Sequence, residues 1–270
     1  MNKYNKTIIN NCTLYQGDCL EVMKIIPDKS IDMILCDLPY KMTSGKWDIL
    51  IPSDKLWEYY DKIIKDDGII CLFGTQPFTT DIINSNRNKF RYCWYWEKSS
   101  RPNGFVHAKN KPLTKIEEVC IFSKYKYGHE SQVENRMRYY PQNVKSIGIK
   151  KVGPKGEMLG KRPNQDGKLY EAFENYPNNV LLYSHDEPSV HPTQKPVELC
   201  QYLIKTYTKE NETVLDNCSG SGTTGVACKY INRKCMLIEK DEKYFQMGVD
   251  RIRNPEKQLK KIETKFSLFE

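Results

Sequence analysis

The segment Val214-Leu215-Asp216-Asn217-Cys218-Ser219-Gly220-Ser221-Gly222-Thr223-Thr224-Gly225 runs from an apolar stretch through a glycine-rich turn into a helical pattern. Glycine lets the backbone turn sharply and approach a ligand closely, as nucleotide and cofactor sites require. The lysine of a phosphate-binding Walker loop is missing. Three glycines fit the G-x-G-x-x-G spacing, and Glu239 ends the next apolar run, where a ribose-binding acid is expected. The segment favours a cofactor-binding α/β fold, with a tight turn that binds no ligand as the alternative.

Apolar runs and helical patterns alternate along most of the chain, which is typical of a parallel α/β sheet. The sequence predicts strands at residues 13–16, 31–36, 68–73, 92–97, 117–123, 213–216 and 234–239. It predicts helices at residues 20–26, 54–65, 77–85, 196–207, 223–231 and 242–253. The stretch 130–179 breaks this rhythm, so we interpret it as an insert between two halves of one domain.

Length and composition limit the class of protein. A chain of 270 residues has room for one large domain with an insert. The mean hydropathy is −0.68 and no apolar run reaches 18 residues, so no membrane span is expected. Residues 1–18 show no basic-then-apolar leader, and we expect a cytoplasmic protein. The charged tail at 255–270 is expected to be a solvated terminal helix.

The ten cysteines do not indicate a disulfide framework, because a core can stabilise a chain of this length and no Cys-x-x-Cys motif is present. Several, such as Cys36 and Cys71, lie in apolar runs where a free thiol acts as a small hydrophobic group. The four histidines have no metal-ligand spacing, so no metal is expected.

A second candidate site follows the predicted strand 31–36, which leads into Asp37-Leu38-Pro39-Tyr40. Ligands of doubly wound folds bind at the carboxyl ends of such strands. Proline fixes its own φ and biases Leu38 to an extended conformation. The Asp37 carboxylate and the Leu38 carbonyl can then accept both hydrogens of an exocyclic amine while Tyr40 stacks on the attached ring. A strand-terminating turn is the alternative interpretation.

Together these motifs resemble those of amino-group DNA methyltransferases that use S-adenosylmethionine. The family's hallmarks are [DNS]-P-P-[YFW] and D-x-F-x-G-x-G, matched here at 37–40 and 216–222. In the family's β class the catalytic motif precedes the cofactor motif, with the target-recognition region between them, and this chain has that order. Further matches are Gly17-Asp18, His191-Pro192-Thr193-Gln194-Lys195-Pro196 and Glu239-Lys240-Asp241.

The resemblance covers nearly the whole chain, from residue 14 to residue 253, and has two departures. Leu38 replaces the first proline, and Asn217-Cys218 replaces the usual Pro-Phe, which puts an aromatic cofactor contact in doubt. The resemblance implies a Rossmann-like methyltransferase fold with a mixed seven-stranded sheet, helices on both faces and a circularly permuted order. Residues 1–129 and 181–270 would form one catalytic domain, with 130–180 as an inserted DNA target-recognition region.

The resemblance also implies roles for individual residues. Asp37, Leu38, Pro39 and Tyr40 would be catalytic, acting on an adenine N6 amine flipped out of duplex DNA. Asp18 would bind the cofactor's adenine end and Glu239 its ribose. The methionine side would contact Asp216, Ser219, Gly220, Ser221, Gly222 and Thr223. Thr193, Gln194 and Lys195 would close the pocket, and His191 would be structural. The methyl donor carries its own leaving group, so no metal is needed.

The insert carries most of the net charge of +8, with nine basic and three acidic residues between 131 and 170. Lysine and arginine contacts to phosphates supply affinity for double-stranded DNA. The candidate DNA contacts are Arg136, Arg138, Lys150, Lys151 and Arg162, with the interleaved Tyr139, Tyr140 and Tyr170. A homodimer and a cognate restriction nuclease, as in restriction-modification systems, are further expectations from the family.

Three alternatives remain at this stage. Cytosine-N4 methyltransferases of the same family more often carry serine where this chain has Asp37. A nicotinamide-dependent dehydrogenase would use the glycine spacing but leaves residues 37–40 and the basic insert unexplained. A DNA-binding module without catalysis would need neither Asp37 nor an intact cofactor loop.

Overall fold

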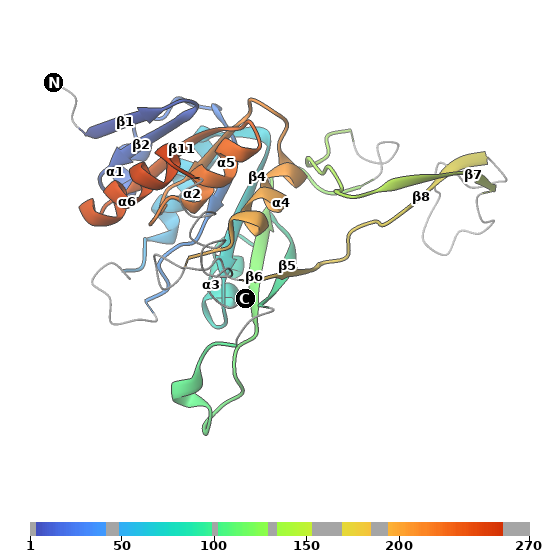
Figure 1. Cartoon of the computed structure of the whole chain (residues 1–270), viewed down its shortest axis with the longest axis horizontal. Coiled ribbons are helices and arrows are strands. Elements are labelled where there is room, and N and C mark those ends of the chain that lie inside the picture. The colour runs from blue at the N-terminus through green and yellow to red at the C-terminus, as the bar shows by residue number, and fades with distance from the viewer. Residues whose placement is uncertain are drawn as a thin grey trace, which may run out of the picture.

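A computed structural model describes residues 4–41, 49–98, 102–128, 134–152, 169–184 and 194–255. Within these ranges the main sheet has nine strands in the order β1-β2-β11-β10-β3-β4-β6-β5-β9 (Figure 1). They are β1 (Asn5–Ile9), β2 (Cys12–Gln16), β3 (Ile31–Cys36), β4 (Ile64–Gly74), β5 (Phe90–Lys98), β6 (Ile116–Phe122), β9 (Val180–Tyr183), β10 (Thr213–Asp216) and β11 (Lys234–Glu239). A separate antiparallel hairpin consists of β7 (Lys145–Val152) and β8 (Leu169–Glu174).

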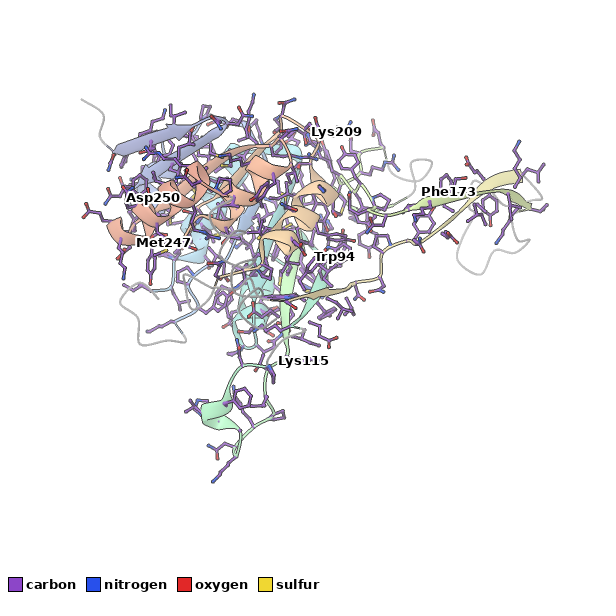
Figure 2. The ribbon with its side chains drawn as sticks, in the orientation of Figure 1. Trp94, Lys115, Phe173, Lys209, Met247 and Asp250 are labelled. Atoms are coloured by element: carbon purple, nitrogen blue, oxygen red, sulfur yellow. The ribbon has the colours of Figure 1, made fainter. Side chains whose placement is uncertain are left out.

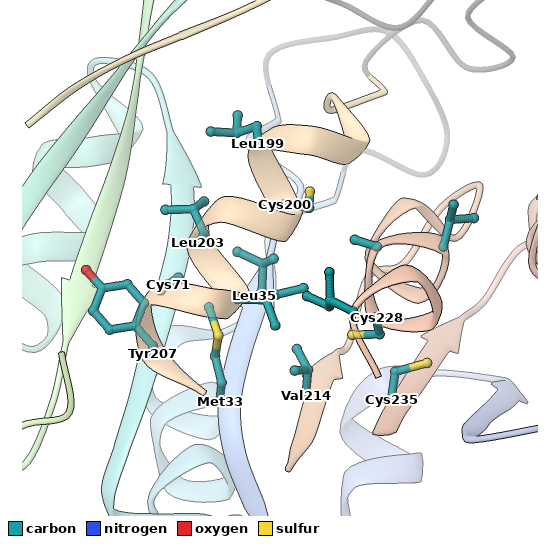
Figure 3. Packing of buried hydrophobic residues seen from close by; sticks show 14 of the residues in the cluster. Met33, Leu35, Cys71, Leu199, Cys200, Leu203, Tyr207, Val214, Cys228 and Cys235 are labelled. Atoms are coloured by element: carbon teal, nitrogen blue, oxygen red, sulfur yellow. The ribbon is translucent and has the colours of Figure 1, made fainter. Parts of the chain in front are cut away.

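Helices cover both faces of the sheet. One face packs against α4 (Val197–Tyr207), α5 (Thr223–Tyr230) and α6 (Glu242–Arg253), and the other against α1 (Cys19–Met23), α2 (Ser53–Ile63) and α3 (Phe78–Ser85). Figure 3 shows the first of these cores, in which Leu199 and Leu203 of α4 belong to one hydrophobic cluster with Met33 and Leu35 of β3. The three layers confirm the predicted α/β fold with helices on both faces.

The centre of the sheet positions the two motif-bearing loops. β2, β11, β10, β3 and β4 run parallel, and β6 is antiparallel to its neighbours β4 and β5. β3 pairs directly with β10, through Met33 with Val214 and Ile34 with Leu215. The helix after β3 lies on one face and the helix after β10 on the other, which makes this pair a topological switch point. Crevices at such points hold the ligands of doubly wound folds.

The central elements lie close to their predicted positions. Strands 31–36, 213–216 and 234–239 have the predicted bounds, and helix 242–253 does too. Asp241 starts this helix as N-cap, because its side chain accepts a hydrogen bond from the Tyr244 amide. The first helix ends at Met23, earlier than predicted, and the chain continues in turns with hydrogen bonds from the Ile25 amide to the Val22 carbonyl and from the Ile26 amide to the Met23 carbonyl.

Two edge strands raise the count from the predicted seven to nine. β1 pairs antiparallel with β2, and β9 pairs parallel with β5. Their side chains are mostly exposed or half-buried, so the sequence carries no continuous apolar run there. The strand β3, which leads into residues 37–40, precedes β10, which leads into the glycine-rich loop. Circular permutation stays our interpretation of this order.

Two arms leave the body of the protein in different directions (Figure 1). One is the β7–β8 hairpin, which falls inside the predicted insert. The other is residues 102–115, between β5 and β6, with the short 3-10 helix η1 (Phe105–His107). Residues 256–270 of the tail predicted at 255–270 lie outside the described residues. Among those described, no helix is both long and apolar enough to cross a membrane.

Candidate active site

The two sequence motifs meet at one cleft of about 1490 Å³. Residues 37–40, which follow β3, and residues 216–221, which follow β10, both line it. Gly17 and Asp18 after β2, and Glu239 at the end of β11, complete the same rim. Parallel neighbouring strands bring these four segments together because their carboxyl ends share one edge of the sheet.

Two glycines in left-handed conformations shape the turn after β10, Gly220 with φ of 49° and Gly222 with φ of 79°. The Gly220 amide donates to Glu239 Oε2 at 2.7 Å, which joins the turn to the end of β11. Gly222 is not among the cleft-lining residues, and a Cβ there would lie 2.9 Å from Gly248 Cα in α6. Gly222 therefore allows the turn to pack on α6, and its contact with a ligand stays a prediction.

Asp216 is a buried acid at the base of the cleft, with 6% of its surface exposed. Its Oδ2 accepts from the Thr224 hydroxyl at 2.6 Å and its Oδ1 from the Cys218 amide at 3.2 Å. Burial raises the pKa of Asp216 to about 7. A cation bound in the cleft would favour the charged form of this carboxylate.

Two further acids lie at the rim. Glu239 also accepts from the Asp241 amide at 2.8 Å, and burial raises its pKa above the usual range. Asp18 caps α1 by accepting from the Leu20 amide at 3.0 Å, and its other oxygen lies 3.2 Å from the ammonium of Lys240. These carboxylates are held in place at positions from which they can accept hydroxyl or amine hydrogens of a ligand.

The departures at Asn217 and Cys218 have local explanations. The Tyr60 hydroxyl donates to Asn217 Oδ1 at 2.6 Å inside the core, so asparagine ties the loop to α2. Hydrogen bonds with the thiols of Cys19 and Cys36, together with burial, hold the pKa of Cys218 well above its usual range. A compact, neutral thiol thus lines the cleft where the family motif has an aromatic ring.

The loop 37–40 is rigidly supported. The Tyr40 hydroxyl donates to Asp37 Oδ1, and the Tyr40 ring packs on Phe78 with centroids 4.5 Å apart. Burial raises the pKa of Tyr40 well above its usual range, so the hydroxyl remains a donor. Leu38 is 5% exposed and packs in the core between the sheet and α1 to α3, which explains how leucine replaces the first proline.

A chain of alternating charges continues from Asp37 into the protein. Lys195 Nζ lies 2.6 Å from Asp37 Oδ2 and 3.2 Å from Glu117 Oε2, and Lys98 Nζ lies 2.5 Å from Glu117 Oε1. Lys98 is 1% exposed and Glu117 is 8% exposed. Burial opposes the charge of Lys195, but the carboxylates of Asp37 and Glu117 outweigh it and raise the pKa of Lys195. Four buried or half-buried groups therefore balance one another beside the cleft.

This network changes one prediction and adds two residues. Lys195 was predicted to close the cofactor side of the pocket, whereas its ammonium contacts Asp37. Lys98 and Glu117 also line the cleft, and the sequence analysis missed them. One sequence signal could have identified them, a charged residue at the end or start of an apolar strand. Lys98 ends β5, and Glu117 lies near the start of β6.

The remaining predicted residues are spread over three settings. Gln194, Ser219, Ser221 and Thr223 line the cleft, and the Ser221 hydroxyl accepts from Arg251 Nη1 at 2.7 Å. Thr193, His191 and Arg162 lie outside the described residues. The exposed residues are Lys150 and Lys151 on the β7–β8 hairpin and Arg136, which forms a bridge with Lys126 near the start of the insert.

Arg138 has a structural role and is a correction to the predicted DNA contacts. Its guanidinium donates to Asp67 at 2.6 and 2.8 Å and to Asp32 at 3.0 Å, and lies 2.9 Å from Glu212. The side chain is only 13% exposed. Three carboxylates therefore occupy the donors that a phosphate would need.

No group of three or more metal-ligating side chains occurs in the part of the chain that the structure describes.

Known proteins that resemble this chain are DNA methyltransferases. A family model described as DNA methylase matches residues 31–250. The Type II methyltransferase M.BglII of Bacillus subtilis is 26% identical over 261 residues, which cover 87% of this chain and 67% of that protein. The Type II methyltransferase M2.MboI of Moraxella bovis is 25% identical, over 88% of this chain and 86% of its own length.

Solved structures share the fold. PvuII DNA methyltransferase, described as cytosine-N4-specific, superposes with a TM-score of 0.64 at 18% identity, over 90% of this chain and 86% of its own. The complex of M1.HpyAVI with SAM gives a TM-score of 0.57 at 20% identity, over 89% and 99% of the two chains. With a family model that spans most of its length, this chain belongs to the N6/N4 amino-group DNA methylase family.

Proposed function

We propose that the protein transfers a methyl group from S-adenosylmethionine to adenine N6 in duplex DNA. The supporting observation is that the Asp37 carboxylate, an acceptor for an amine hydrogen, faces the same cleft as the glycine-rich loop after β10. The N6 lone pair is delocalised into the ring, so the nitrogen must be held and aimed at the methyl donor. Asp37 and the Leu38 carbonyl supply the two acceptors. Cytosine N4 is the second candidate target, and a dehydrogenase has no support from the family.

S-adenosylmethionine is the methyl donor of this family, and its sulfonium supplies both the methyl group and the leaving group. The residues of the cleft fit such a ligand. Asp216 has a raised pKa that a nearby cation would lower, and the ligand's methionine end is cationic. Glu239 at the end of β11 is suited to the ribose hydroxyls, and Asp18 to the adenine end.

The target base would occupy the part of the cleft beside residues 37–40. A base inside a duplex cannot reach Asp37, so it must be flipped out of the helix. The ring of Tyr40, already packed on Phe78, offers a face on which the flipped base can stack. The Lys195 ammonium, 2.6 Å from Asp37 Oδ2, would hold the Asp37 carboxylate in position.

Product analysis tests the proposal. Purified protein is incubated with S-adenosylmethionine and unmethylated DNA. The DNA is then digested to nucleosides, which are identified by mass spectrometry. We expect N6-methyladenine, and mapping of modified bases then gives the recognition sequence. N4-methylcytosine instead would overturn the adenine assignment, and the absence of both products would overturn the proposed activity.

We further propose residues 130–180 as the DNA-recognition region and residues 1–129 with 181–270 as the catalytic domain. The β7–β8 hairpin projects from the body, and its side chains, Phe173 among them, stand clear of the sheet (Figure 2). A two-stranded ribbon fits the major groove of B-DNA. By analogy with its Type II relatives, the enzyme would act in restriction-modification beside a nuclease of the same specificity. A homodimer remains part of this proposal.

Salt dependence tests the role of the hairpin. Lys150 and Lys151 are exposed on β7, and each phosphate contact releases about one counterion. Replacing both with alanine should therefore flatten the plot of log affinity against log salt by roughly one unit per lost contact. The matched control replaces the exposed Lys209 and Lys234, which lie near the amino ends of β10 and β11. Fluorescence anisotropy with labelled duplex measures both slopes, and equal slopes in all variants would place the phosphate contacts elsewhere.

A further inference from the structure

The arm of residues 102–115 is a built element at the mouth of the cleft. An antiparallel bridge closes its base, with Asn103 N to Thr114 O at 2.8 Å and Thr114 N to Asn103 O at 2.9 Å. Gly104, with φ of 95°, turns the chain into η1, which is followed by hydrogen bonds from Asn110 and Lys111 to the His107 carbonyl. The arm extends away from the sheet, with Lys115 at its base (Figure 2).

The tip of this arm combines apolar exposure with positive charge. Phe105 is 62% exposed and Val106 is 92% exposed, so two adjacent apolar side chains face solvent at the end of a hydrogen-bonded turn. Lys109 and Lys111 follow directly, and residues 102–115 contain no acidic residue. Lys111 and His107 also line the cleft that contains Asp37.

We infer that this arm is a second DNA-contacting element, whose Phe105–Val106 tip inserts into the base stack as the target base leaves it. The inference rests on the proposed action on duplex DNA. A flipped base leaves a gap in the stack, and apolar side chains of DNA-bending proteins insert between base steps in the same chemical way. Lys109 and Lys111 then contact the flanking phosphates. Gly104 and His107, on either side of the tip, line the cleft that receives the base, so insertion and capture occur next to each other.

The test uses the double variant Phe105→Ala/Val106→Ala. Methyl transfer (kcat/KM) is measured on a matched duplex that carries the mapped site and on the same duplex with a mismatch opposite the target base. A mismatched base costs less to extrude. Relative to the parent enzyme, the variant should lose roughly 10- to 100-fold on the matched duplex and less than about threefold on the mismatched one. The control is Ile8→Ala, which removes another exposed apolar side chain. Ile8 is 65% exposed on the edge strand β1, and this variant should match the parent on both substrates.

Two results would overturn the inference. The first is activity like that of the parent on the matched duplex. If light scattering then shows a changed oligomeric state in the variant, the tip contacts another protein chain instead of DNA. The second is an equal loss on both duplexes, because the tip would then support the fold or the cofactor site. If the parent itself methylates neither duplex, the proposed function fails instead, so the two failures are distinguishable.

Discussion

Replacing Asp37 with alanine is expected to reduce methyl transfer by a factor on the order of 1,000 or more. The carboxylate would accept a hydrogen bond from the target amine, worth about 1.5 to 3 kcal/mol for a charged acceptor. Losing the acceptor also misplaces the nitrogen, which alone can cost about 100-fold. Affinity for S-adenosylmethionine should stay close to that of the parent, because Asp216, Glu239 and the Gly220 turn form that part of the cleft.

The structure makes this experiment interpretable. Lys195 keeps Glu117 at 3.2 Å when Asp37 is removed, so its buried charge remains paired and the variant should fold. Asp28→Ala is the matched control, since Asp28 is 67% exposed and pairs loosely with Lys62 at 3.5 Å. A labelled-methyl transfer assay, together with calorimetric titration of the cofactor, measures both quantities. Substantial activity in Asp37→Ala would contradict the mechanism and the assignment of residues 37–40 as the catalytic loop.

Tyr40 refines the same experiment. Stacking of a base on an aromatic ring is worth about 1 to 3 kcal/mol, so Tyr40→Ala should weaken the hold on a flipped base. Stacking alone would make Tyr40→Phe as active as the parent, because phenylalanine keeps the ring. Because the Tyr40 hydroxyl donates to Asp37 Oδ1, phenylalanine also removes a bond that orients the carboxylate, and its activity should lie between those of the parent and Tyr40→Ala.

Strands β3, β10 and β11 could be predicted to the residue because they lie in the middle of the sheet and their side chains are mostly buried. Every residue of β3 is buried, so an uninterrupted apolar run marks it in the sequence. β1, β9 and the β7–β8 hairpin lie at edges or away from the core, and their exposed side chains leave no such run. Their pairing depends on neighbours that the local sequence does not reveal.

The candidate site was predictable as far as topology determines it. Loops after parallel strands share one edge, which brings residues 37–40 and 216–221 together whatever their distance in the chain. The pairing of Lys195 with Asp37 spans 158 residues, and no local pattern encodes it. Charge type alone also cannot separate a phosphate contact from a structural ion pair, so Arg138 resembled its exposed neighbours until its three carboxylate partners were seen.

Replacing Lys195 with methionine should have the second largest effect, on both stability and catalysis. The side chain keeps its approximate length but loses the charge between Asp37 and Glu117, and breaking a buried ion pair typically costs 3 to 5 kcal/mol. We expect about 3 kcal/mol in the free energy of unfolding, the low end, because the Asp37 side chain is 26% exposed. The misplaced Asp37 carboxylate should lower kcat by about 100-fold at saturating substrates.

A double-mutant cycle separates positioning from a general loss of stability. Lys195→Met, Asp37→Asn and the double variant are unfolded in urea, and the double variant should lose less than the sum of the singles by about 0.5 to 3 kcal/mol, as expected for groups in direct contact. Lys55→Met is the control, since Lys55 pairs with Glu58 at 2.9 Å on an exposed helix face, where an ion pair contributes about 0 to 1 kcal/mol. Additive losses, or a Lys195→Met enzyme with the kcat of the parent, would show that the ammonium does not position Asp37. Coupled losses with a lowered kcat would identify Lys195 as the residue that holds the amine acceptor in place.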